Sequence, residues 1–345
     1  MSTSPVIHPL PAQSDSDQAG SEPAPRVVPA MPGGPRLLVS ACLLGEKVRY
    51  DGQHKLDHFL VRQLGRFVEW ERVCPESDSG MPTPRPSMHL VGDPQNPRLV
   101  NRKGEDLTEQ MLGFVRAKLE ELQGAPLCGF VCKKDSPSSG MTRVKIYNER
   151  GMAERVGAGL FTAAFVQRFP LVPVEEEGRL HDPRLRESFI ERIFCRRRWL
   201  DLLEGGKTRG RLVEFHSDHK LLLLSHGREA YSALGRLVAA AKEHRPAELY
   251  ELYERGFMAA LARPATVKKT TDVLMHMVGY FKKQLSSDEK AELLETVDGY
   301  RREQVPLIVP LVLIRHYVRK YGVAYLARQR FLSPYPAELM LRNHV

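Results

Sequence analysis

Three short apolar segments in the first half of the chain each end at reactive or turn-forming residues. The first ends at Cys42, and the second ends at Cys74 with Glu76 just beyond it. The third, 127–132, leads to the serine-rich turn 136–140. If these segments are neighbouring parallel strands, their carboxyl ends meet at one edge of a sheet, where open α/β sheets bind ligands. Two thiols, a carboxylate and a serine-rich turn would then line one crevice.

A thiolate reacts near neutral pH only beside a positive charge, a helix N-terminus or a metal ion. Cys42 is followed by a tight turn at Gly45, whose backbone N–H groups would face a ligand. Arg49, Tyr50 and Asp51 come next and are candidates to line the same crevice. A single cysteine at a strand end is more often a buried apolar filler. Here two such cysteines are each followed by a turn and polar residues, so both a packing role and a functional role remain open.

Length, cysteine spacing and charge limit the class of protein. The 345 residues are typical of two domains. Five cysteines in a chain of this length do not make a disulfide scaffold, and the absence of a Cys-x-x-Cys pair argues against a zinc ribbon. The net charge of +9 permits an acidic partner without requiring one. The apolar stretch 305–314 is too short to span a membrane and no cleavable signal is visible, so we expect a cytoplasmic protein without a membrane partner.

The first half of the chain alternates between strand and helix patterns. Residues 1–35, rich in proline, serine and glycine, predict a disordered tail. Residues 36–198 predict an α/β domain, a Rossmann-like parallel sheet flanked by helices. The long link 75–105 predicts a functional loop. The expected strands are 36–41, 68–73, 127–132 and 171–174, and the expected helices are 54–66, 106–122, 157–169 and 184–200.

Strand signals fade after about residue 200, so residues 199–345 predict an all-α domain. A capped helix start is expected at Ser287, because Glu289 and Lys290 follow it. The expected helices are 212–241, 246–261, 271–285, 287–302 and 306–321.

Several motifs follow one another over about residues 36–195: Ser40-Ala41-Cys42-Leu43-Leu44-Gly45, Val48-Arg49-Tyr50-Asp51-Gly52, Val73-Cys74-Pro75-Glu76, Ser136-Pro137-x-x-Gly140 and Leu180-His181-Asp182-Pro183. In this order they resemble the thiouracil desulfidase family. The helical half contains His216-x-x-His219-Lys220, His226, Met275-His276 and Gly279-Tyr280-Phe281. It is similar to an uncharacterised domain of YbgA-like proteins, a resemblance that carries no activity.

The resemblance implies a 4Fe-4S cluster held by three cysteines, with one iron open to the sulfur of a thiolated pyrimidine or related thioamide. The iron would act as a Lewis acid while water attacks the carbon and sulfide leaves. Cys42 and Cys74 match two of the cluster ligands. Glu76 would carry a proton, and Ser136 would position water or substrate.

The third ligand position of the family departs from the pattern, because it is occupied here by Ser139. A serine oxygen is a harder ligand than a thiolate. Three interpretations follow: Cys132 substitutes as the ligand, Ser139 itself binds iron, or the cluster and the desulfurising activity are lost. Cys132 and Cys128 lie four residues apart on one predicted strand and are expected to share a face, with Cys128 packing in the core.

Two features of the helical half suggest other ligands. His216, His219 and His226, with His276, predict either a metal site or hydrogen bonds on a helix surface. Basic pairs with aromatic neighbours predict either a nucleic-acid surface or an ordinary solvated face. The alternatives to a desulfidase are therefore a non-catalytic protein that binds a base or nucleic acid, and a helical protein–protein adaptor. The basic pairs are Lys268-Lys269, Lys282-Lys283 and Arg301-Arg302, with Tyr280, Phe281 and Tyr300 between them.

Overall fold

A parallel four-stranded sheet forms the centre of the first half of the protein. The computed structural model describes residues 33–344, so most of the predicted tail 1–35 lies outside the described residues. The strands are β1 (Arg36–Ser40), β2 (Glu69–Val73), β5 (Leu127–Cys132) and β8 (Val174–Glu176), in the order β2-β1-β5-β8. All three pairings are parallel, which confirms the predicted sheet.

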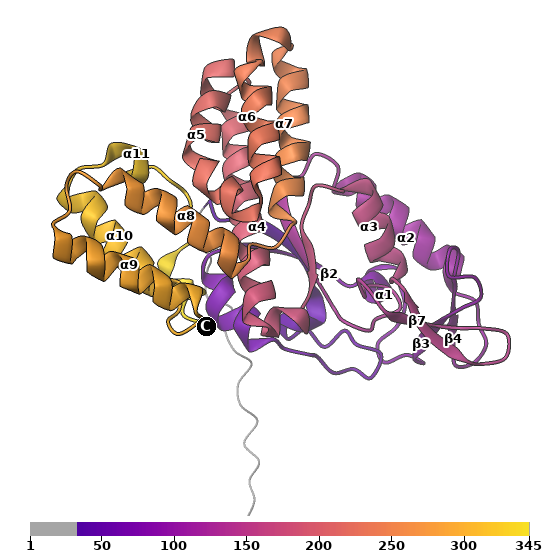
Figure 1. Cartoon of the computed structure of the whole chain (residues 1–345). Helices are drawn as coiled ribbons and strands as arrows, with labels where there is room; N and C mark the ends of the chain where they lie inside the picture. The colour runs from indigo at the N-terminus through magenta and orange to yellow at the C-terminus, as the bar shows by residue number, and fades with distance from the viewer. Residues whose placement is uncertain (1–32, 345) are drawn as a thin grey trace, which may run out of the picture.

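Helices cover both faces of this sheet, as the α/β prediction requires (Figure 1). On one face, Leu37 of β1 packs in a core with Ile193 of α4 (Pro183–Glu204). On the other face, Leu38 packs with residues of α2 (Thr108–Glu121) and α3 (Leu160–Arg168). Alternate residues of β1 therefore serve opposite cores, because successive side chains of a strand point to opposite faces.

A second, mixed sheet was not predicted. It has the order β4-β3-β6-β7, and two of its strands lie in the link 75–105, so that link is not one long loop, although several of its residues line the pocket described below. These strands are four or five residues long and partly exposed, so they lack the apolar run that marks the central strands. The link contains α1 (Pro75–Asp78), β3 (Met88–Val91) and β4 (Arg98–Asn101); β6 (Val144–Tyr147) and β7 (Ala153–Gly157) follow β5.

A bulge in β5 separates two cysteines that the sequence predicts on one face. The pairing of β1 with β5 shifts register between Arg36 and Leu37. Cys128 therefore packs in the core beside Leu37, whereas Cys132 packs in the core on the other face. The expectation of a shared face is wrong because the bulge adds one residue to the strand.

Smaller differences concern where elements begin and end. The predicted helix 54–66 is reduced to irregular helical turns over 59–66. The helix predicted at 157–169 begins at Leu160, because Gly157 still belongs to β7. The strand predicted at 171–174 lies later, at Val174–Glu176.

The second half is helical, as predicted. The expected helix 212–241 is two helices separated at Gly227, and Ser286, not Ser287, caps α9 through a capping box with Glu289. The helices are α5 (Arg209–His226), α6 (Arg228–Ala239), α7 (Pro246–Leu261), α8 (Val267–Tyr280), α9 (Ser287–Arg301), α10 (Ile308–Lys320) and α11 (Ala324–Ala327). None of the helices in the described part of the chain has the length and apolar character that a bilayer crossing needs.

The long helix α4 is continuous over 22 residues and lies between the sheet and the helical half (Figure 1). Its first half contributes Ile193 to the sheet core, and its second half contributes Trp199 to the helical core. Trp199 stacks on Tyr253 of α7, with ring centroids 5.5 Å apart. The predicted domain boundary at 198/199 thus falls inside a helix.

Candidate functional site

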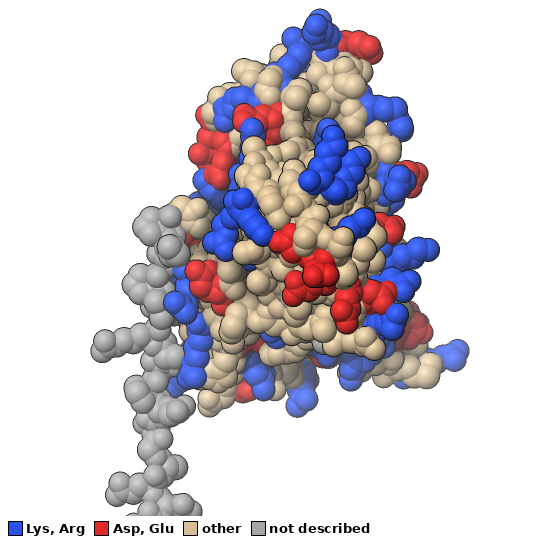
Figure 2. Space-filling view, turned by 60° about the vertical axis from the view of Figure 1, so that its left-hand side comes forward, with Lys and Arg blue, Asp and Glu red and all other residues tan. Residues whose placement is uncertain are grey.

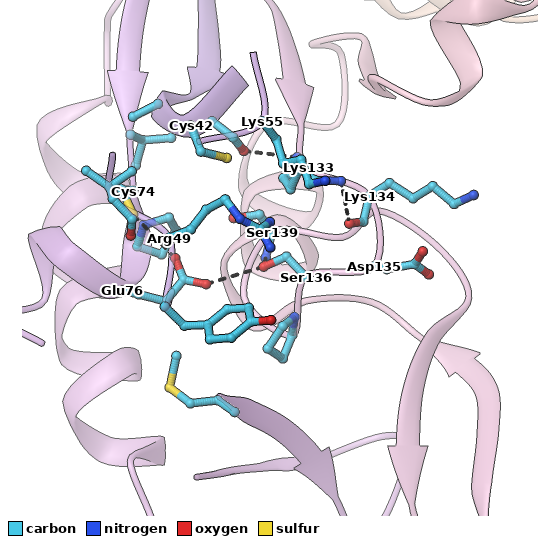
Figure 3. Close-up of a pocket in the computed structure, with 18 of the residues that line it drawn as sticks. Cys42, Arg49, Lys55, Cys74, Glu76, Lys133, Lys134, Asp135, Ser136 and Ser139 are labelled. Carbon is cyan, nitrogen blue, oxygen red and sulfur yellow. Dashed lines mark hydrogen bonds between the residues drawn. The ribbon is translucent and has the colours of Figure 1, made fainter. Parts of the chain in front are cut away.

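One pocket of about 350 Å³ opens where β1, β2 and β5 end (Figure 3). Its position is the edge of the parallel sheet at which the sequence places the reactive residues. Most of the candidates line it: Cys42, Arg49, Tyr50, Cys74, Glu76, Ser136 and Ser139.

Local backbone structure brings the two thiols to the pocket wall. Cys42 lies in a single helical turn after β1, and that turn ends at Gly45 in the left-handed conformation (φ 98°). Cys74 is the last residue before α1, whose first residue is Pro75, a favoured residue at that position. Both residues line the pocket although each is only 8% exposed.

Both pocket thiols hold their protons strongly. Burial, and then the charges of Cys74 and Glu76, raise the pKa of Cys42 to about 12. Burial, and then Glu76, raise the pKa of Cys74 to about 11. Neither thiol ionises near pH 7 unless a cation binds and replaces its proton.

The Glu76 carboxylate lies between the Cys74 thiol and the serine turn. Its Oε2 accepts a hydrogen bond from the Cys74 thiol at 3.5 Å, and its Oε1 accepts hydrogen bonds from Ser138 at 2.6 Å and Ser136 at 3.3 Å. Arg85 Nη2 is 3.9 Å from Oε2. These contacts fix the carboxylate at the pocket wall.

The serine turn is held by its own hydroxyl groups. Ser136 Oγ accepts hydrogen bonds from the backbone N–H groups of Ser138 at 3.3 Å and Ser139 at 3.1 Å. The Ser138 and Ser139 hydroxyls are 3.2 Å apart. The turn packs against Gly159 so closely that a Cβ there would be 2.3 Å from the Ser138 carbonyl carbon. Ser138 makes the shortest contact to Glu76, yet sequence reasoning missed it, because no pattern distinguishes it from the adjacent serines.

The pocket wall is more basic than acidic. Arg49 Nε and Arg85 Nε are buried and have no hydrogen-bond partner within the described residues. Buried polar groups without partners carry a desolvation cost that a ligand can relieve. The charged residues of the lining are Arg49, Lys55, Glu76, Arg85, Lys133, Lys134 and Asp135.

Asp51 and Cys132 do not line the pocket. Asp51 Oδ1 accepts a hydrogen bond from the Gln53 backbone N–H and lies 3.4 Å from Arg49 Nε, a charge contact rather than a hydrogen bond. Cys132 is fully buried in the core that contains Phe161, with its thiol 3.5 Å from the Glu175 carbonyl oxygen. Cys132 therefore does not meet Cys42 and Cys74.

The histidines of the helical half each contact a different group inside the protein. His216 Nδ1 is 3.0 Å from the Tyr253 hydroxyl, and His219 Nδ1 is 2.7 Å from the Phe215 carbonyl oxygen. His226 Nε2 is 2.7 Å from Glu191 Oε1. All three histidines are buried, so the prediction of helix-surface hydrogen bonds is wrong. Across residues 33–344 no group of three His, Cys, Asp or Glu side chains is arranged to hold a metal ion.

Contacts within the protein engage several of the basic pairs. Lys269 Nζ donates to the His226 and Pro264 carbonyl oxygens, and Arg301 and Arg302 both pair with Asp298. Figure 2 shows Lys and Arg interspersed with Asp and Glu on the face it presents. These contacts give no support to the predicted nucleic-acid surface.

Comparison with known proteins identifies both halves. The model of the 2-thiouracil desulfurase family matches residues 37–177, and a model described as a protein of unknown function (DUF1722) matches residues 220–336. The uncharacterised protein YbgA of Escherichia coli (strain K12) is 36% identical over 161 residues, which cover 46% of this chain and 95% of YbgA. The chain belongs to the YbgA family. The predicted fusion of a desulfurase-type domain with a YbgA-type helical domain is confirmed.

Two further relatives match less than half of the chain. The uncharacterised protein YbbK of Bacillus subtilis (strain 168) is 29% identical over 138 residues, which cover 38% of this chain and 89% of YbbK. The solved 4Fe-4S-dependent thiouracil desulfidase TudS is 31% identical and matches 45% of this chain and 99% of its own, with a TM-score of 0.36.

Proposed function

We propose that the pocket removes sulfur from a thiolated pyrimidine or a related thioamide and replaces it with oxygen from water. One observation supports this most strongly. Cys42, Cys74 and Glu76 meet at one pocket, inside the span that the 2-thiouracil desulfurase model matches. The balanced reaction converts C=S and water into C=O and hydrogen sulfide, so it needs no oxidant or reductant.

The donors of the pocket fit a 4Fe-4S cluster at two of three positions. Cys42 and Cys74 are free thiols at the pocket wall, and soft thiolates are the ligands that iron–sulfur clusters prefer. The third position offers only the Ser139 hydroxyl. When bound, such a cluster would supply a Lewis acid for the sulfur of the substrate.

Glu76 and Ser136 are the groups proposed to manage the water and its proton. The Glu76 carboxylate accepts the proton of the attacking water, because it lines the pocket and touches both the Cys74 thiol and the serine turn. Ser136 donates to Glu76 Oε1 and lines the pocket, so it positions the carboxylate oxygen against which the water or substrate lies.

The basic wall favours a substrate that carries negative charge. Arg49 and Arg85 each have a buried Nε that finds no hydrogen-bond partner among residues 33–344, a donor set suited to a phosphate or carboxylate oxygen. Tyr50 is 44% exposed and offers a ring on which a pyrimidine can stack, with Arg49 5.4 Å from its centre. Asp51 holds Arg49 from outside the pocket. We therefore expect a thiolated nucleotide to bind better than the free base.

The test is sulfide release by protein purified and reconstituted without oxygen. Iron and acid-labile sulfide are measured first, and then sulfide released from 2-thiouracil and from 2-thiouridine 5′-monophosphate. Cys42→Ala and Glu76→Gln should abolish release. Cys128→Ala removes a thiol outside the pocket and should leave release within about twofold of the wild type. Iron-loaded protein that releases no sulfide from either compound would refute the proposal.

The Ser139 hydroxyl favours one alternative, a pocket that binds the thiolated ligand without converting it. In that case calorimetry would show binding of the nucleotide to cluster-free protein, and no sulfide would appear at any iron content. Arg49→Ala would weaken such binding, because it removes a buried donor from the wall.

A further inference from the structure

A chain of hydroxyl groups runs from the third ligand position to Glu76. Ser138 is fully buried and Ser139 is 2% exposed, so water does not compete for their hydrogen bonds. Ser138 Oγ donates to Glu76 Oε1 at 2.6 Å, and it lies 3.2 Å from Ser139 Oγ. The short distance to a carboxylate marks the first of these bonds as the stronger one.

The number of protons decides the direction of the second bond. A serine hydroxyl has one proton and two lone pairs. Ser138 uses its proton on Glu76, so in the pair with Ser139 it must be the acceptor. Ser139 therefore donates its own proton to Ser138.

Ser136 does not substitute for the hydrogen bonds from Ser139 to Ser138 and from Ser138 to Glu76. Its oxygen already accepts two backbone N–H groups, and its contact with Glu76 Oε1 is 3.3 Å. Without Ser138, the carboxylate oxygen that faces the turn would keep only this longer bond.

We propose that Ser138 is the positioning residue that holds Glu76, and that Ser139 supports Ser138 in this role instead of binding iron. The inference rests on the proposed function for the importance of Glu76, but the hydrogen-bond chain itself does not depend on it. The two uses of Ser139 compete, because a hydroxyl oriented toward Ser138 is not available as a charged ligand for a metal. The residue at the family's third ligand position, Ser139, thus helps to hold the Glu76 carboxylate in this protein.

The first test compares Ser138→Ala and Ser139→Ala with the wild type. Losing a bond to a carboxylate should lower kcat about 10- to 100-fold in Ser138→Ala and less in Ser139→Ala. KM should change by less than about threefold, since Glu76 acts on water rather than on binding. Ser138→Thr, which keeps the hydroxyl, should recover most of the loss. Iron content should match the wild type in both alanine variants.

The second test needs neither a cluster nor activity. Ser138 holds Glu76 in the position where Glu76 Oε2 accepts a hydrogen bond from the Cys74 thiol at 3.5 Å, so the thiol is engaged by the carboxylate. A released carboxylate should therefore speed alkylation of Cys74 by iodoacetamide at pH 8 about threefold or more in cluster-free Ser138→Ala. Thr162→Val is the matched control: it removes the 2.7 Å bond from Thr162 Oγ1 to the Ser139 carbonyl oxygen but leaves the hydroxyl chain intact.

Three results would decide against the inference. One is wild-type kcat together with a wild-type alkylation rate in Ser138→Ala. Another is a loss of iron in Ser139→Ala that Ser138→Ala does not share, which would make Ser139 a ligand. The third is equal acceleration of alkylation in Thr162→Val, which would indicate general loosening of the turn. If the wild type releases no sulfide at all, the proposed function fails, and the alkylation rates still decide the inference.

Discussion

The protons on the pocket thiols give a prediction that can be worked out in numbers. Cys42 has a pKa of about 12 and Cys74 a pKa of about 11, against 9.0 for an unperturbed thiol. Because only the thiolate attacks iodoacetamide, raised pKa values slow alkylation. In cluster-free native protein, both cysteines should resist alkylation near neutral pH.

The size of the effect follows from the fraction of thiolate. At pH 8 a thiol with a pKa of 9.0 is about one-tenth ionised, and each further unit of pKa reduces that fraction about tenfold. Cys74 should therefore react about 100-fold more slowly than the same residue in unfolded chain, and Cys42 about 1,000-fold more slowly. Raising the pH from 8 to 9 should speed alkylation of both cysteines about tenfold, since pH 9 is still well below the pKa of either thiol.

The assay is timed alkylation followed by peptide mapping, with the protein in urea as the reference for each cysteine. Glu76→Gln provides a second measurement, because the Glu76 charge raises the pKa of both thiols. That variant should speed alkylation of both thiols. Native Cys74 that reacts within about tenfold of the unfolded chain would show that the pocket does not suppress the thiolate.

Three further predictions concern the turn, the junction of the two halves and the pocket wall. Gly159→Ala places a Cβ 2.3 Å from the Ser138 carbonyl carbon, so it should cost about 1–3 kcal/mol in thermal unfolding, whereas Gly210→Ala in open space on α5 should not destabilise. Glu191→Gln leaves His226 and its neighbours without a buried counter-charge and should cost about 3–5 kcal/mol in urea unfolding. Burial opposes ionisation of this pair, but their contact lowers the pKa of Glu191 and raises that of His226. The stability that Glu191 contributes should be present above pH 4.5 and lost as the pH falls through the lowered pKa of Glu191. The stability that His226 contributes should be present below pH 6.5 and lost as the pH rises through the raised pKa of His226. Arg49→Ala should raise KM for the thiolated nucleotide more than for the free base, measured as sulfide release.

The sequence predicts the parallel sheet well because its central strands are buried on both faces. The strand β5 is buried along its whole length and so reads as a continuous apolar run. Such strands end at one edge, so the positions of Cys42 and Cys74 relative to each other follow from the topology alone. The second sheet escapes prediction because strands such as β3 are short and only half buried.

The details inside the site depend on backbone features that leave no trace in the residue pattern. The bulge in β5 sends Cys132 to the face away from Cys128, and a strict two-residue period cannot show this. The choice of Ser138 as the residue that reaches Glu76 depends on the fold of the turn, where Asp135 has a φ of 59°. Neighbouring serines are chemically identical, so only their placement distinguishes them.

The helix α4 also contacts both halves of the protein through single side chains. Arg196 Nε donates to the Leu127 carbonyl oxygen at 2.7 Å, and its Nη1 pairs with Glu254 Oε1 of α7 at 3.1 Å. One side chain in the interior of α4 thus contacts the start of β5 and the helical bundle together. A helix interior bends gradually unless proline, glycine pairs or a bulge interrupts it, and residues 184–204 contain neither proline nor glycine. The strand β5 that Arg196 contacts leads on to the serine turn, whose Ser138 hydrogen-bonds to Glu76 in the pocket.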